Sequence, residues 1–298
     1  MEQRRFGRFT RRLVASGTVA TLLLGMLAVT APVAAKQFAD WAAPSQDGLA
    51  NVNTTVLEGC PMQSPDGLSL YFASNRAGGS GGLDIWVASR ASTGDVWGVP
   101  QNLGDTINSA ANEFCPTPVR GNGLFFISAR EGAGDIYFAR LNPVHGWTTP
   151  VNLGSNVNSS TVGEAGPSYF EAEGRAFLYF SRGPDIYASE QASDGSWGSA
   201  APVAELNSAA SDNRPNVRKN GLEVVFDSNR ADGQGDLDIW TATRASVADA
   251  WSAPTNLGAV VNTAAAELRA SFSWDGSTLY FGRNPSPNGS MDLWFTTR

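Results

Sequence analysis

One set of charged side chains recurs five times along the 298-residue chain. Each copy has an acidic residue, then an arginine, then an aspartate. The copies are Glu58, Arg76 and Asp84; Glu113, Arg130 and Asp135; Glu164, Arg182 and Asp185; Asp212, Arg230 and Asp238; Glu267, Arg283 and Asp292. Carboxylates gathered around one site can hydrolyse a glycosidic bond or bind a cation, so these residues are the first candidates for chemistry.

The same set can instead be structural. The planar guanidinium of arginine can donate hydrogen bonds to two carboxylates at once. Catalytic acids need pKa values that differ from one another, whereas the five copies look interchangeable and each acid has its own arginine. We therefore expect the fifteen residues to be structural clamps that hold a repeated unit together, and we assign no catalytic residue.

Residues that depart from the repeat are the better candidates for binding. Two positions after the acid, the copies carry, in order, Cys60, Cys115, Gly166, Arg214 and Arg269. The two arginines lack repeat partners and could bind a carboxylate or an acidic sugar; solvated surface charge is the alternative. Tyr169 and Trp274 also break the pattern and could stack on sugars, with core packing as the alternative.

The cysteines and one acidic loop suggest two further features. Cys60 and Cys115 occupy the same position in neighbouring repeats, so they could form a disulfide in an oxidising compartment; two reduced, buried thiols are the alternative. Asp232, Asp236 and Asp238 could bind calcium, although their spacing is not that of an EF-hand and solvated acids in a glycine-rich turn are the alternative. We expect no other metal or cofactor.

The elements that position these residues are short strands. Each repeat contains a glycine-type turn followed by a run such as Leu70-Tyr71-Phe72, then a strand opened by the aspartate, then a Trp-x-x-Pro segment. Four strands in a period of about 50 residues indicate an all-β, five-bladed β-propeller with four antiparallel strands per blade. The first Trp-x-x-Pro segment, at Trp41, precedes the first complete blade, so we expect this N-terminal strand to complete the last blade.

The repeat resembles a known family. Ser64-Pro65-Asp66-Gly67, the run from Leu70 to Arg76, and Asp84-Ile85-Trp86 resemble the WD-repeat-like propeller repeat of the Pro-Asp-Gly type, as in TolB-like proteins. The resemblance covers residues 41–298. It implies a propeller fold and a binding scaffold of the cell envelope.

The N-terminal segment has the composition of an export signal. Five arginines up to Arg12 precede an apolar stretch from Leu13 to Val29, and Val33 and Ala35 provide a small-residue cleavage site. We expect residues 1–35 to be a signal peptide, with an uncleaved anchor as the alternative, and residues 36–298 to form a single propeller domain. The net charge of −7 belongs to a lysine-poor chain, which argues against nucleic-acid partners.

Two classes of function remain. The first is a non-enzymatic, TolB-like binding or protein-interaction module, periplasmic or secreted and monomeric, whose partner is an envelope protein or a glycan. The alternative is a carbohydrate-active enzyme similar to five-bladed glycoside hydrolases, or a lectin-like glycan binder. The absence of differentiated acids favours the non-enzymatic class.

Overall fold

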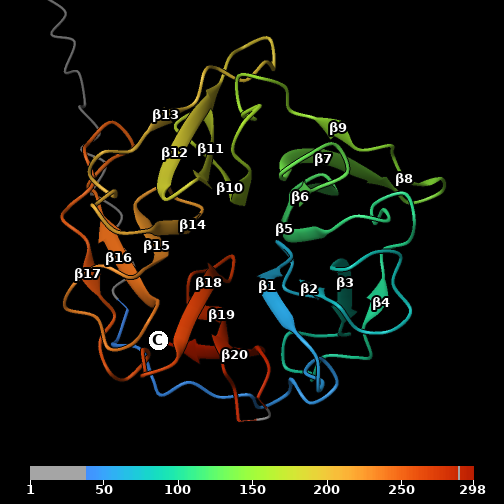
Figure 1. Ribbon diagram of the computed structural model, residues 1–298, viewed down its shortest axis with the longest axis horizontal. Coiled ribbons are helices and arrows are strands. Elements are labelled where there is room, and N and C mark those ends of the chain that lie inside the picture. Colours follow the sequence, from blue (N-terminus) through green and yellow to red (C-terminus); the bar gives the residue numbers. More distant parts are fainter. Residues whose placement is uncertain (1–37, 288) are drawn as a thin grey trace, which may run out of the picture. The chain divides into compact units, whose positions relative to one another are not determined.

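Five small antiparallel sheets form a ring in the computed structural model, which describes residues 38–287 and 289–298 (Figure 1). Within these residues there is no α-helix, and hence no helix that could cross a membrane. The predicted all-β, five-bladed propeller is therefore confirmed. The predicted signal peptide, residues 1–35, lies outside the described residues.

The strands of each blade follow one another outward from the axis in chain order. Blade 1 comprises β1 (Glu58–Gln63), β2 (Ser69–Ser74), β3 (Asp84–Ser89) and β4 (Gln101–Asn102). Blade 2 comprises β5 (Glu113–Val119), β6 (Gly123–Ser128), β7 (Asp135–Asn142), β8 (Gly146–Trp147) and β9 (Val151–Asn152). Blade 3 comprises β10 (Glu164–Ala172), β11 (Arg175–Arg182), β12 (Asp185–Gln191) and β13 (Ala201–Pro202).

Blade 4 has four strands, whereas blade 5 has three. Blade 4 comprises β14 (Asp212–Val217), β15 (Glu223–Ser228), β16 (Asp238–Thr243) and β17 (Thr255–Asn256). Blade 5 has β18 (Ala266–Phe272), β19 (Thr278–Asn284) and β20 (Asp292–Thr297). The outermost strand of blades 1 to 4 has only two residues, which lie several positions after the tryptophan. Blade 2 also has an additional short strand, β8, that pairs with β7.

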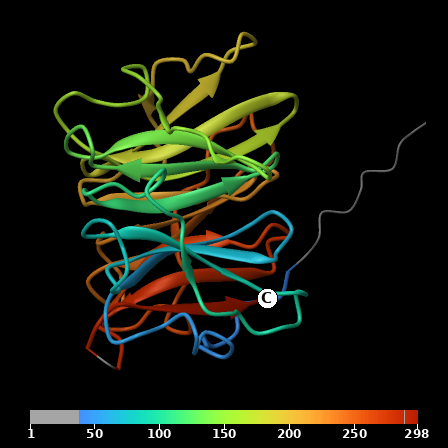
Figure 2. The same cartoon turned by 90° about the vertical axis from the view of Figure 1, so that its right-hand side faces the viewer.

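The ring closes through residues from the N-terminal side of blade 1. Ser45 and Phe295 form an antiparallel bridge, with their two backbone hydrogen bonds at 2.8 and 3.0 Å. The Ala42 amide donates to the carbonyl of Thr297 over 2.9 Å. Both views show this blue segment beside the red strand β20 (Figures 1 and 2). The predicted closure is present in the structure, and it covers the edge that β20 would otherwise expose.

The core lies between neighbouring blades. One phenylalanine from each second strand is fully buried: Phe72, Phe126, Phe180, Phe226 and Phe281. Phe180 of blade 3, for example, packs in one cluster with Phe125 and Ile127 of blade 2. Burying such a ring contributes about 1.5–3 kcal/mol, so the Leu-Tyr-Phe runs hold the blades face to face.

A chain that begins at Leu57 should fail to close the ring. It would lack the Ser45 bridge and Asn53, whose side chain bonds both backbone groups of Leu293 over 2.9 Å. Compared with a chain that begins at Phe38, we expect a lower melting temperature and aggregation through the exposed edge of β20. Thermal unfolding and size-exclusion chromatography measure both effects. Equal melting temperatures of two monomeric proteins would contradict this closure.

Candidate functional site

The inner strand of every blade contains a β-bulge at the same position, two residues after the first-strand acid. The pairing register of β1, for instance, shifts between Gly59 and Met62. The residues at this position all have a left-handed backbone, with φ between 47° and 60°: Cys60, Cys115, Gly166, Arg214 and Arg269. We call these five residues the bulge ring. A left-handed conformation is uncommon for residues other than glycine. Its recurrence at four such residues shows that the bulge is a regular part of the blade structure.

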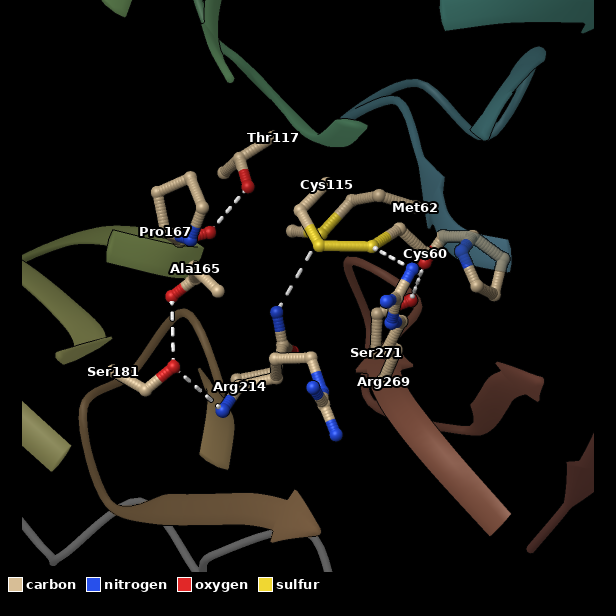
Figure 3. The surroundings of a disulfide bond; sticks show 12 residues. Cys60, Met62, Cys115, Thr117, Ala165, Pro167, Ser181, Arg214, Arg269 and Ser271 are labelled. Carbon is tan, nitrogen blue, oxygen red and sulfur yellow. Dashed lines mark hydrogen bonds between the residues drawn. A yellow bond between two sulfur atoms is a disulfide. The ribbon is translucent and has the colours of Figure 1, made fainter. Parts of the chain in front are cut away.

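The bulge ring fills the propeller axis (Figure 3). Of the two alternatives for the cysteines, the structure has the disulfide, which joins Cys60 and Cys115 with their Cα atoms 4.7 Å apart. On the other side of the ring, Gly166 leaves room for Arg214, because a Cβ atom at this glycine would lie 2.6 Å from the Cα atom of Arg214. The cavity that remains has a volume of about 30 Å³. The axis is therefore too narrow for a sugar.

The sequence suggested that both arginines of the bulge ring lack partners, but one of them has a partner. Arg214 pairs with Asp227, a fully buried residue of β15, through Nε at 3.1 Å and through Nη2. The backbone amide of Arg269 donates to the same carboxylate over 2.9 Å. The prediction was therefore wrong for Arg214, because sequence analysis missed Asp227. The signal was an acid that stands where the other second strands carry Ala73, Ile127, Ser181 and Gly282.

The first-strand acids are buried and hydrogen-bonded. Glu58 is fully buried and accepts bonds from the Thr54 amide at 2.9 Å, the Thr54 hydroxyl at 2.7 Å and Arg76 at 2.9 Å. Equivalent ion pairs join Arg130 to Glu113, Arg182 to Glu164, Arg230 to Asp212 and Arg283 to Glu267. These contacts are those expected of a structural clamp. They occupy most of the hydrogen-bonding capacity of the carboxylates, so little of it remains for a substrate.

The third-strand aspartates are not part of the same clamp. Asp84 accepts hydrogen bonds from the Gly81 amide at 3.1 Å and from the Asn102 side chain at 3.1 Å. Asp135 and Asp238 likewise accept from Asn152 and Asn256, each at 2.8 Å. In the described part of the chain, no ion pair joins these three aspartates to an arginine. The expectation that one guanidinium holds both acids was wrong for these three residues, because an asparagine of the outermost strand donates to each aspartate, and in blades 1 and 4 amides of the glycine-rich loop donate as well.

An asparagine that sequence analysis missed joins each blade to the next. The Asn108 side chain accepts from the amide of Ile85 at 2.8 Å and donates to its carbonyl at 3.0 Å. Ser109, the next residue, donates to Glu113, and Arg130 donates to the carbonyl of Ile107. The same asparagine joint is made by Asn53, Asn158, Asn207 and Asn262. The signal was an Asn-Ser or Asn-Thr pair shortly before each acid.

The loop considered for calcium does not gather its acids. Asp238 is buried and accepts hydrogen bonds from the amides of Gln234 and Gly235, whereas Asp232 and Asp236 are exposed. Within residues 38–287 and 289–298, no three His, Cys, Asp or Glu side chains lie together as a metal site would require. A calcium ion here would have to displace the bonds that fix the loop.

The other end of the axis is an open pocket of about 450 Å³, formed by the turns between first and second strands of blades 2 to 5. We call it the hairpin-face pocket; its lining includes Arg120, Tyr169, Glu171, Lys219 and Trp274. The Lys219 ammonium donates to the carbonyl of Tyr169 over 2.8 Å and lies 4.9 Å from the centre of the Trp274 ring. The Arg120 guanidinium lies 4.8 Å from the same ring. The structure thus brings Tyr169 and Trp274 together and leaves Arg214 and Arg269 at a separate place on the axis.

In the hairpin-face pocket, two cationic groups lie close to the Trp274 ring, and the lining also contains Glu171 and Asp275. Among the described residues, no carboxylate forms an ion pair with Arg120 or Lys219. Loss of solvation lowers the pKa of the Lys219 amine to about 8, so the amine is charged at neutral pH. Burial and the neighbouring Glu171, which accepts a 2.5 Å bond from the Tyr169 hydroxyl, raise the pKa of that hydroxyl. Sequence analysis missed Lys219, although it and Lys36 are the only lysines of the chain.

Two grooves extend the hairpin-face pocket toward the rim. One has a volume of about 660 Å³, lies between blades 2 and 3 and includes Trp197 and Tyr169. The other has a volume of about 770 Å³, lies between blades 5 and 1 and includes Trp97 and Trp274. Tyr169 lines both the first groove and the pocket, and Trp274 lines both the second groove and the pocket, so the three hollows adjoin one another through aromatic rings.

Comparison with known proteins supports the fold. No protein family and no curated protein matches the sequence. An α-L-arabinofuranosidase from Podospora anserina in complex with cellotriose is among the similar solved structures, with 12% identity and a TM-score of 0.56, covering 87% of this chain and 96% of that one. A GH62 hydrolase in complex with xylotriose has 11% identity and a TM-score of 0.53, covering 87% and 97%.

TolB-type structures match less well. A putative TolB from Agrobacterium tumefaciens has 17% identity and a TM-score of 0.49, covering 82% of each chain. Family-43 glycoside hydrolases reach a TM-score of 0.54. The TolB-like family assignment therefore stays a prediction, and the similar structures are mostly those of the alternative class, the glycoside hydrolases. At these identities the likeness shows the propeller fold alone.

Replacing Arg130 with alanine should destabilise the protein. The change leaves buried Glu113 without its ion pair, which costs about 1–3 kcal/mol of unfolding free energy. Arg140→Ala is the matched control, because Arg140 is exposed and its guanidinium contacts the carbonyl of Gly121 and the ring of Phe138 but no buried acid, so its cost should stay below about 1 kcal/mol. Urea unfolding of both variants measures the difference. Equal stabilities would argue against the clamp.

Proposed function

We propose that the protein is a non-catalytic glycan-binding propeller and that the hairpin-face pocket binds an acidic sugar. The observation that carries this proposal is Trp274 in an open pocket, with the centre of its ring 4.8 Å from the Arg120 guanidinium and 4.9 Å from the Lys219 ammonium. Aromatic rings contact the apolar faces of sugars, and ammonium and guanidinium groups bind carboxylates. Of the two expected partners, an envelope protein or a glycan, this concave aromatic pocket fits the glycan better.

The arrangement of the acids supports binding without hydrolysis. Glycoside hydrolysis requires two available carboxyl groups on either side of the scissile bond, with separated pKa values. The first-strand acids are buried in clamps, and Asp227 is held by Arg214. The bulge ring fills the propeller axis, so a sugar cannot lie among the first-strand acids and Asp227.

Glycoside hydrolysis is the second candidate function, because most of the similar structures are glycoside hydrolases. The carboxylates that line the hairpin-face pocket are Glu171 and Asp275, so a hydrolase would have to use these two. Both already accept hydrogen bonds, from the Tyr169 hydroxyl and from Ser273. Turnover of an arabinoxylan oligosaccharide that disappears in a well-folded Glu171→Gln, Asp275→Asn protein would establish this second function in place of the first.

The proposed location is outside the cytoplasm. A disulfide between Cys60 and Cys115 persists in oxidising compartments such as the periplasm, and the composition of residues 1–35 predicts export. Glycans of the envelope or of the surroundings would be available to the protein there.

Binding should depend on the ring and on the charge separately. Calorimetry with a glucuronic-acid-substituted xylotriose and with plain xylotriose distinguishes the two contributions. We expect Trp274→Ala to weaken both sugars at least about threefold, because the stacking surface is lost. Lys219→Met should weaken the acidic sugar about tenfold and leave the neutral one unchanged, whereas Lys219→Arg should retain binding. Unchanged affinities in Trp274→Ala and Lys219→Met would reject this site.

Affinity for the acidic sugar should fall as the pH rises through about 8. The lowered pKa of the Lys219 amine means that its charge is present below this pH and lost above it, while the sugar carboxylate stays ionised throughout. Titrations between pH 6 and pH 9.5 should show this decline in the native protein. Lys219→Arg should bind equally well over the whole range, because a guanidinium keeps its charge. An affinity of the native protein that does not change with pH would show that the Lys219 amine does not contribute to binding.

A further inference from the structure

Together with Asp227, the bulge ring carries two positive charges and one negative charge. Arg214 and Arg269 line the axial cavity, and the acid in contact with them is Asp227. This acid forms a bidentate pair with the Arg214 guanidinium, whereas Arg269 contributes only its backbone amide. Among the described residues, the Arg269 guanidinium thus forms no ion pair of its own, because Asp227 is paired with Arg214.

The hydrogen bonds of Arg269 are also incomplete. Its guanidinium makes a single bond within the described part of the chain, from Nη1 to the sulfur of Cys60 over 3.3 Å (Figure 3). Its Nε atom is buried and has no acceptor. The clamp arginines differ, because each pairs with a carboxylate and also donates to a backbone carbonyl, as Arg76 does with Glu58 and Val52. A buried charge without a partner is costly, so Arg269 calls for an acceptor that the chain does not supply.

The cavity sets the size of that acceptor. Its volume of about 30 Å³ accommodates one or two water-sized particles, and its lining includes the proline rings of Pro61, Pro116 and Pro215. A carboxylate carried by a sugar ring does not fit, and apolar walls disfavour a strongly hydrated ion. We propose that the bulge ring binds a single monatomic anion, chloride, beside Arg269 on the propeller axis.

The charge state of Arg269 supports an anion. Burial and the neighbouring Arg214 lower the pKa of the Arg269 guanidinium to about 10, and it remains charged at neutral pH. A water molecule would leave the charge of the guanidinium unbalanced, whereas chloride would neutralise it. This site uses no residue of the hairpin-face pocket, so the chloride proposal can be tested independently of glycan binding.

Chloride-dependent stability tests the site. The melting temperature of the native protein is measured in sodium chloride and in sodium isethionate at equal ionic strength, because isethionate is too large for the cavity. We expect a saturable rise of several degrees with chloride and none with isethionate. Arg269→Met should abolish the chloride dependence. Arg244→Met is the matched control, since Arg244 also has a buried nitrogen without a partner but lies away from the axis, and it should keep the dependence.

A direct measurement covers the case in which Arg269→Met does not fold. The ³⁵Cl resonance of dilute chloride should broaden in the presence of native protein and narrow again when bromide is added as a competitor. Equal melting temperatures in the two salts, a chloride dependence that persists in folded Arg269→Met, or the absence of broadening with native protein would each overturn the proposal.

Discussion

The left-handed bulge in each inner strand is the feature on which the centre of the propeller depends. Five strands that converge on one axis have no further strand to pair with, so their inward backbone groups need other partners. At the bulge the ladder shifts, and groups become available to the next blade: the Pro61 carbonyl accepts from Ser271 over 2.6 Å, and the Arg269 amide donates to Asp227 over 2.9 Å. The disulfide provides the corresponding link between blades 1 and 2.

The two ends of the propeller axis differ in how much their residues vary from blade to blade. At the end where the inner strands begin, each blade repeats the same carboxylate, arginine and asparagine, and variation there would loosen a joint between blades. At the end with the hairpin turns, the blades share little beyond the turn itself. Five positions after the bulge, the blades carry a different residue each, in order Pro65, Arg120, Glu171, Lys219 and Trp274, so this end can acquire a binding surface without disturbing the fold.

Sequence periodicity was sufficient for the fold, because turns, buried phenylalanines and charged pairs recur in every blade. It was less informative for the site. The pairing of Arg214 with Asp227 depends on which residues face each other across a shifted register, and spacing along the chain does not reveal a bulge. Three of the third-strand aspartates were misjudged because their partners are asparagines of the outermost strands and, for Asp84 and Asp238, loop amides, which every residue except proline carries. Tyr169 and Trp274 were found because they break the repeat, whereas Lys219 lies beside an ordinary turn and was overlooked.

The closing bridge between Ser45 and Phe295 has a consequence for the order of events during synthesis. The residues that complete blade 5 leave the ribosome before blades 1 to 4, and their partners in β20 leave it after those blades. Blades 1 to 4 each contain their own edge strand and can fold as they emerge, but the N-terminal segment has to wait for almost the whole chain. Ring closure therefore comes last, and a polypeptide interrupted before β20 exposes an unpaired segment that quality-control proteases can recognise.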